Sequence, residues 1–210
     1  MNYFELFGVD PEQYMRPLKL KGYQVLNLSR QFEKLFEKSS PEICLEALED
    51  KYFNLLNDET EANDAHQGYK ILNDDILRLE YYLDQLAKKT NLDLSNVSLN
   101  LEFLTRCFED NQILNTTPDR ILKLLRSKIN LDNFDEDILD ESFIDPESAE
   151  APEFIEAKEI LLKCKSDYRQ YLYEGYEAIR NLNLIGSAEA LAKLRFVANI
   201  LKGDVKDITI

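Results

Sequence analysis

The sequence is poor in the residues that make turns. Its 210 residues include only 6 glycines and 6 prolines, whereas leucine, lysine and the acidic residues are frequent. Sheets with many turns draw on glycine and proline, so the shortage favours long helices. The 44% hydrophobic content is enough for a packed core. The length corresponds to one or two domains.

Histidine and cysteine are equally scarce. The chain has 1 histidine, His66, and 3 cysteines without a CxxC pair, Cys44, Cys107 and Cys164. A zinc site or a Cys–His nucleophile has little to draw on here. Unpaired cysteines in helical apolar patterns are typical of buried thiols in a reducing compartment. We therefore expect no metal, no cofactor and a cytoplasmic protein, with His66 in a structural role.

The sequence also lacks long apolar runs and an excess of positive charge. No run approaches the roughly 18 apolar residues that identify a membrane span. The first residues, MNYFELFGV, have no basic start of the kind that targeting segments carry. The formal net charge is −15, which would repel phosphate groups of nucleic acids and of anionic lipids. The sequence therefore predicts neither a nucleic-acid-binding protein nor a membrane protein.

The first of three pieces, residues 1–89, contains two helical patterns. Apolar residues recur at helical spacing over residues 28–36, and a basic stripe lies opposite them, formed by Arg30, Lys34 and Lys38. Pro41 disfavours helical geometry at Ser40, so this helix stops there. A second pattern runs over residues 65–86 and is interrupted at residues 73–75, where an aspartate can cap a new helix. We expect two helices that meet at a tight turn.

The remaining pieces are a linker, residues 90–98, and a helical region, residues 99–210. Residues 131–153 hold 10 acids and no base, which is typical of a solvated loop inserted between helices. Long amphipathic patterns follow from Phe154 to about Leu182 and from about Ser187 to Lys202. Gly186 is expected in the turn between them, with Ser187 as the helix cap. This piece therefore reads as an antiparallel helical bundle.

Four short motifs resemble a known family. They are NYFELFG at residues 2–8, RLEYYL at 78–83, FLTRCF at 103–108 and KLRF at 193–196. In this order they are similar to the motifs of the HscB family, the J-domain co-chaperones of iron–sulfur cluster assembly. The resemblance implies an all-α, L-shaped molecule in which a J-domain-like helical hairpin domain (1–89) precedes an antiparallel three-helix bundle (99–210).

The resemblance also implies a function. Members of the family bind a DnaK-type ATPase chaperone through the J-domain and an IscU-type scaffold protein through the bundle, and promote the ATP hydrolysis that drives cluster release. They carry out no covalent chemistry of their own. We therefore expect a non-enzymatic co-chaperone. The alternative is a helical adaptor that has lost the chaperone coupling and binds another partner through its bundle.

The chaperone-binding residues implied by the resemblance are altered at their centre. J-domains carry His-Pro-Asp after the basic helix, and here the tripeptide falls on Ser40-Pro41-Glu42. Serine cannot replace a ring with two nitrogens, and Glu42 reaches an arginine at a greater entropic cost. Together with Arg30, Lys34 and Lys38, this loop predicts weak coupling to the ATPase. The alternative interpretation is an ordinary helix stop.

The scaffold-binding residues implied by the resemblance lie on the bundle. An apolar patch would consist of Leu104, Phe108 and Phe196, and its rim of Thr105, Glu109, Gln112 and Arg195. Leu104 and Phe108 are four residues apart and share a helix face, and an apolar cluster with a polar rim is typical of a binding hot spot. The alternative is that all three apolar residues belong to the core. Thr105 stands where the family usually has methionine, which reduces the contact area.

Overall fold

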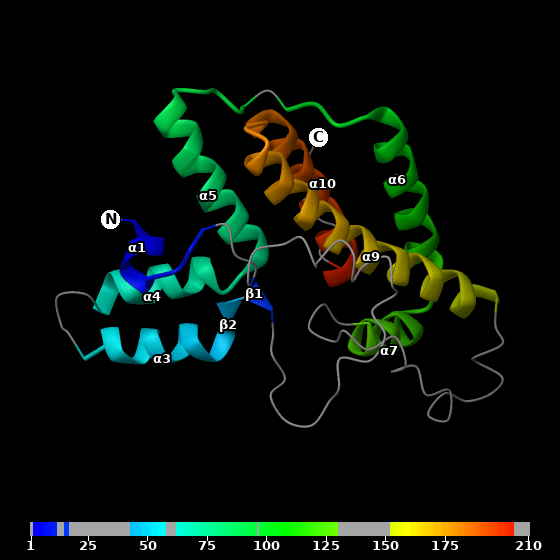
Figure 1. The fold of residues 1–210 in the computed structure, drawn as a ribbon. Helices are drawn as coiled ribbons and strands as arrows, with labels where there is room; N and C mark the ends of the chain where they lie inside the picture. The colour runs from blue at the N-terminus through cyan, green and yellow to red at the C-terminus, as the bar shows by residue number, and fades with distance from the viewer. Residues whose placement is uncertain are drawn as a thin grey trace, which may run out of the picture. The chain divides into compact units, whose positions relative to one another are not determined.

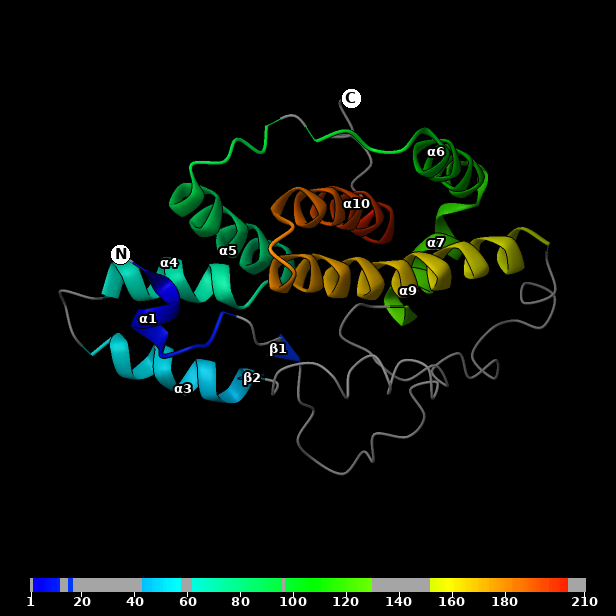
Figure 2. The same ribbon diagram turned by 45° about the horizontal axis from the view of Figure 1, so that its top comes forward.

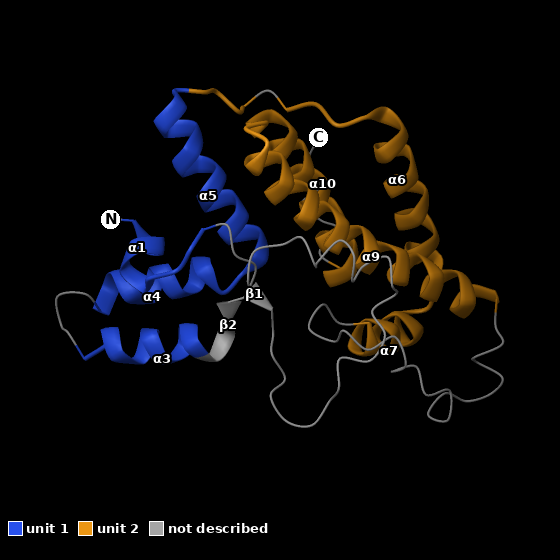
Figure 3. Ribbon diagram, viewed as in Figure 1, with its two compact units in different colours: residues 1–91 blue, residues 92–210 orange. Residues whose placement is uncertain are grey.

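The protein is all-α, as the sequence predicts. The computed structural model describes residues 2–11, 15–16, 43–57, 62–95, 97–129 and 152–203. Two compact units are formed, Met1–Asn91 and Leu92–Ile210 (Figure 3). Within the described residues, β-structure is limited to a parallel pair of two-residue strands, β1 (Met15–Arg16) and β2 (Ile43–Cys44).

Figure 1 shows the order of the helices. The first unit contains α1 (Tyr3–Phe7), α3 (Leu45–Leu55), α4 (Ala62–Leu72) and α5 (Asp75–Thr90). The second contains α6 (Leu101–Thr116), α7 (Asp119–Lys128), α9 (Pro152–Arg180) and α10 (Leu184–Lys202). None of the helices described here is long and apolar enough to cross a membrane.

The NYFELFG motif forms α1, a short helix that is capped at both ends. The Asn2 side chain accepts a hydrogen bond from the Phe4 amide at 3.1 Å. Gly8 ends the helix with φ 64°, a left-handed conformation that glycine adopts without strain, and its amide donates to carbonyl oxygens of the same helix. A helix of 5 residues is not stable alone, so α1 depends on its packing.

Helix α1 packs against α4 and α5 at close range. A Cβ at Gly68 of α4 would lie 2.8 Å from the Phe7 ring, so the missing side chain makes room for α1. The Tyr3 amide donates to the Tyr81 hydroxyl at 3.1 Å, and the rings of Phe4 and Tyr82 meet edge to face at 5.7 Å. The motifs NYFELFG and RLEYYL therefore pack on each other in the core of the first unit.

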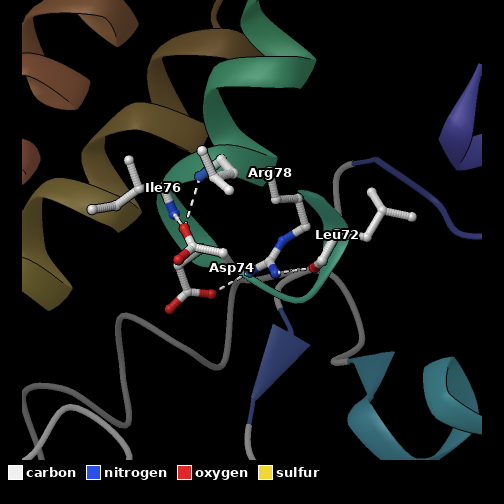
Figure 4. Close-up of polar contacts among 6 residues, drawn as sticks. Leu72, Asp74, Ile76 and Arg78 are labelled. Carbon is white, nitrogen blue, oxygen red and sulfur yellow. Dashed lines mark hydrogen bonds and ion pairs between the residues drawn. The ribbon is translucent and has the colours of Figure 1, made fainter. Parts of the chain in front are cut away.

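The predicted turn between α4 and α5 is confirmed, and Arg78 secures it. Asp74 caps α5 by accepting from the Ile76 and Leu77 amides, both at 2.9 Å. The fully buried Arg78 donates to the Leu72 carbonyl at 2.6 Å and pairs with Asp75 (Figure 4). The guanidinium thus satisfies a carbonyl at the end of α4 from a side chain on α5, which fixes the angle between the two helices.

The second unit is built on the long hairpin of α9 and α10. Helix α10 runs back along α9 in both views (Figures 1 and 2). The core between them holds fully buried side chains from both helices, among them Leu161, Cys164, Tyr176, Leu194, Val197 and Ile200. The prediction of two long helices here is confirmed.

The predicted turn and cap of this hairpin are wrong by several residues. Helix α10 begins at Leu184, after Asn183, whose side chain accepts from the Gly186 amide at 2.9 Å. Leu182, with φ 58°, makes the turn. A Cβ at Gly186 would lie 2.4 Å from the side-chain nitrogen Nδ2 of Asn183. The glycine, which lies within α10, therefore leaves room for the capping side chain. Ser187 is fully buried and caps nothing.

Helix α7 is an addition to the predicted bundle. Leu122 and Leu125 are its buried residues, and Arg126 donates to the carbonyl of Ile200 on α10 at 3.2 Å. The predicted helix over residues 28–36 lies outside the described residues. So does the acidic stretch 131–153, except for Pro152 and Glu153, which begin α9.

Replacement of Arg78 tests its structural role. We expect Arg78→Met to lower the free energy of unfolding by about 2–3 kcal/mol, because it leaves a buried carbonyl without its donor. Denaturant unfolding followed by circular dichroism measures this loss. The control is Lys88→Met, which removes an ion pair with Asp84 whose side chains are 69% and 56% exposed and should cost less than about 0.5 kcal/mol. Equal losses would contradict the assignment.

Candidate functional site: a binding surface on α6

Helix α6 presents a narrow inner face and a broad outer one. Asn100 caps its start by accepting from the Glu102 amide at 2.7 Å. Its buried residues are Phe103, Cys107 and Leu114, spaced four and seven apart on one stripe. This stripe packs against the α9–α10 hairpin, whereas residues on other faces of α6 are exposed, among them Leu101, Thr105, Phe108, Glu109 and Gln112.

The structure leaves the predicted patch partly accessible. Phe108 is 48% exposed, and Leu104 and Phe196 are half-buried. The predicted rim residues are all exposed, namely Thr105, Glu109, Gln112 and Arg195. Leu104 and Phe108 lie one turn apart on α6, whereas Phe196 reaches that helix through Phe103, with the two rings edge to face at 6.0 Å.

Leu101 extends this face, and the prediction did not include it. Its side chain is 78% exposed, and it precedes Leu104 and Phe108 at spacings of three and four residues. That spacing places all three on one side of the helix. The signal was present in the sequence, because the 3–4 repeat begins at Leu101 and not at Leu104.

Arg106 connects α6 to α9 on the other flank. Its guanidinium donates to the Asp167 carboxylate at 2.7 Å and to the Tyr171 hydroxyl at 3.3 Å, and it lies 5.4 Å from the centre of the Phe103 ring. Lys193 of α10 lies over Tyr171, with its ammonium group 5.5 Å from the centre of the ring. Sequence reasoning missed these residues, because Arg106 and Asp167 are 61 positions apart and nothing local links them.

The two flanks meet in a shallow concave surface of about 650 Å³. Its lining includes the first turn of α6 together with Arg106, Glu109, Tyr171 and Lys193. Phe103 is almost fully buried at its base and contacts both Tyr171, at 5.8 Å, and Phe196. The concave surface and the apolar patch are therefore continuous through Phe103.

Burial controls the titration of the groups between α6 and α9. Desolvation raises the pKa of the Cys107 thiol to about 11 and that of Cys164 to about 12. Both thiols are therefore protonated at neutral pH, which suits packing and not nucleophilic chemistry. Burial also raises the pKa of Asp110 and of Asp167, although Lys163 and Arg106 oppose the shift in both cases.

The residues predicted to contact the chaperone belong to a part of the chain outside the described ranges. All six residues, Arg30, Lys34, Lys38, Ser40, Pro41 and Glu42, lie outside the described residues. His66 is described, and it is exposed on α4, where its Nδ1 atom lies 3.1 Å from the Tyr52 hydroxyl. Tyr52 in turn stacks on Tyr69 at 4.5 Å. In the described ranges, no three His, Cys, Asp or Glu side chains are grouped to hold a metal.

The raised pKa of Asp110 gives a pH-dependent prediction. A carboxyl whose pKa is higher in the folded state binds its proton more readily there, so its contribution to stability is lost as the pH rises above about 4. Asp110→Asn removes this loss. We expect the variant to unfold at higher denaturant concentration than the wild type at pH 7, and the gain to shrink toward pH 4.

Asp167→Asn is the contrasting variant. It also removes a carboxylate of raised pKa, but it leaves Arg106 without its ion-pair partner, so we expect a loss of stability at pH 7. A gain from Asp110→Asn that is the same at both pH values would contradict the assignment of the desolvated carboxyl.

Comparison with known proteins adds no relative to this picture. No protein-family model, no curated protein and no solved structure matches the chain. The motifs and the geometry of α6, α9 and α10 are therefore the basis on which its function is inferred.

Proposed function

We propose that this protein is an HscB-like co-chaperone of iron–sulfur cluster biogenesis. Its second unit binds an IscU-type scaffold protein, and its first unit binds a DnaK-type ATPase chaperone weakly. It works in the cytoplasm and carries out no covalent chemistry. Its role is to bring two other proteins together.

The observation that carries this proposal is the pairing of the four motifs. NYFELFG packs on RLEYYL through Tyr3, Phe4, Tyr81 and Tyr82. FLTRCF meets KLRF through the ring contact of Phe103 with Phe196. Within each unit, the contacts between its two motifs support the resemblance to the HscB family.

The exposure of the patch supports a binding role for the second unit. Phe108 is 48% exposed and Leu101 78%, whereas Phe103 on the same helix is buried. Adjacent accessible apolar side chains with a polar rim are an arrangement that partner proteins cover. A core role would leave these side chains buried, as it does Leu114.

The altered tripeptide supports weak coupling to the ATPase. Loss of one charge-assisted hydrogen bond typically costs about 1.5–3 kcal/mol, which weakens binding roughly 10- to 100-fold. The same substitution favours a second candidate function, a helical adaptor that uses the bundle for another partner and no longer takes part in a chaperone cycle. The two candidates differ in whether an IscU-type scaffold binds.

Truncation of Phe108 tests the scaffold-binding surface. We expect Phe108→Ala to weaken binding of an IscU-type scaffold by about 2 kcal/mol, or roughly 30-fold, because a hot-spot side chain loses its contact area. Its unfolding midpoint should stay unchanged, since the ring is half exposed. Isothermal calorimetry and denaturant unfolding on the same samples measure both quantities.

Two controls make this experiment decisive. Leu114→Ala removes a buried side chain from the same helix and should lower stability by about 2–5 kcal/mol, with binding retained where the protein is folded. Ile155→Ala truncates another exposed apolar residue, on α9, and should alter neither quantity. A lowered midpoint for Phe108→Ala, with binding intact, would assign Phe108 to the core.

The chaperone half of the proposal has its own test. Steady-state ATP hydrolysis by a DnaK-type chaperone should rise little when this protein is added. The double variant Ser40→His, Glu42→Asp restores the ring and the shorter carboxylate, and should raise the stimulation about tenfold or more. Strong stimulation by the unmodified protein would show that its loop is functional as it stands.

A further inference from the structure

Lys193 is held in the concave surface without an acidic partner. Its side chain is half-buried, with the ammonium 5.5 Å from the centre of the Tyr171 ring. Within the described part of the chain it makes no ion pair. A lysine fixed against a ring loses side-chain entropy, and a carboxylate brought to this position would gain a charge-assisted contact with a partly desolvated ammonium.

Arg106 adds a second positive charge at the same place. Its Nη2 atom donates hydrogen bonds to Asp167 and Tyr171. Its Nε atom is buried and has no hydrogen-bond partner among the described residues. Among the charged residues that line the concave surface, Arg106 and Lys193 are half-buried. Arg106 is already paired with Asp167, which leaves Lys193 as the half-buried charge of this lining without a carboxylate partner in the parts of the chain that the structure describes.

Negative charge lies at the rim of the same surface. Glu102 and Glu109 both line it, and both are exposed. Neither makes an ion pair within the described ranges, so they do not neutralise Lys193. The half-buried charges of the lining are thus positive and its exposed charges negative, which suits an acidic side chain flanked by basic ones.

We propose that this surface is a specificity subsite that receives an acidic side chain, aspartate or glutamate, of the bound protein. The carboxylate contacts the ammonium of Lys193, and basic neighbours of that residue face Glu102 and Glu109. The subsite is continuous with the apolar patch through Phe103, which contacts Tyr171 and Phe196. As a part of the scaffold-binding surface, this inference rests on the proposed function.

Charge removal at Lys193 is the test. Binding of an IscU-type scaffold is measured by calorimetry for the wild type and for Lys193→Gln, Lys193→Arg and Lys202→Gln. We expect Lys193→Gln to weaken binding about tenfold, as for a half-buried charged contact. Lys193→Arg should retain most of the affinity. Lys202→Gln, an exposed lysine on the same helix, is the matched control and should change binding less than twofold.

A second measurement needs no scaffold. Blocked oligoglutamate and oligolysine peptides are titrated into the full chain, and NMR follows the Tyr171 ring and Lys193 side-chain signals. We expect oligoglutamate to shift the Tyr171 ring signals of the wild type and to leave those of Lys193→Gln in place, whereas the effect of oligolysine should be the same in both proteins. Unfolding midpoints of the variants, measured in parallel, should equal that of the wild type.

The outcomes separate the two proposals. Scaffold binding that is equally strong in Lys193→Gln and Lys202→Gln would overturn the subsite and leave the proposed function standing. If the wild type does not bind the scaffold, the proposed function fails, and the peptide titration decides the subsite. Tyr171 signals that oligoglutamate does not shift, or shifts equally in Lys193→Gln, would then overturn the acidic-residue assignment.

Discussion

The attachment of α6 to the α9–α10 hairpin determines which side chains the second unit presents on its surface. It depends on Phe103, which contacts Tyr171 of α9 and Phe196 of α10, and on Arg106, which pairs with Asp167. Both residues lie close to the inner stripe of the helix. Because one stripe provides the attachment, α6 can present its apolar side and its concave flank without losing its position.

The two units use their motif residues differently. In the first, the motif side chains are largely structural: Arg78 satisfies the end of α4 and Tyr81 holds the α1 backbone. In the second, neighbouring motif positions divide between core and surface, as Phe103 and Phe108 do. Motif resemblance in the first unit therefore bears on its fold, whereas in the second it bears on the proposed recognition of a partner as well.

The sequence predicted those features that depend on local chemistry. The Asp74 cap and the limits of α9 follow from turn residues and helical spacing, and both agree with the structure to within a few residues. The prediction that Gly186 lies in the turn was wrong, because glycine also occurs inside a helix where a capping side chain must fit against it. Helix α7 was missed although Pro118 and Asp119 precede its leucines, which is a recognisable start signal. The network of Arg106, Asp167, Tyr171 and Lys193 joins three helices, and no local pattern encodes it.

Electrostatics connects the surface on α6 with the composition of the whole chain. A net charge of −15 attracts basic proteins over a distance of about one Debye length, roughly 8–10 Å at physiological salt. This long-range attraction raises the rate of encounter but does not fix the orientation of the bound partner. Orientation needs a local charge of the opposite sign at a defined position. In the proposed subsite, Lys193, held over the Tyr171 ring beside the apolar patch, supplies such a charge. A basic partner that carries one acidic residue within its contact surface would therefore be drawn in by the whole molecule and aligned by this single site.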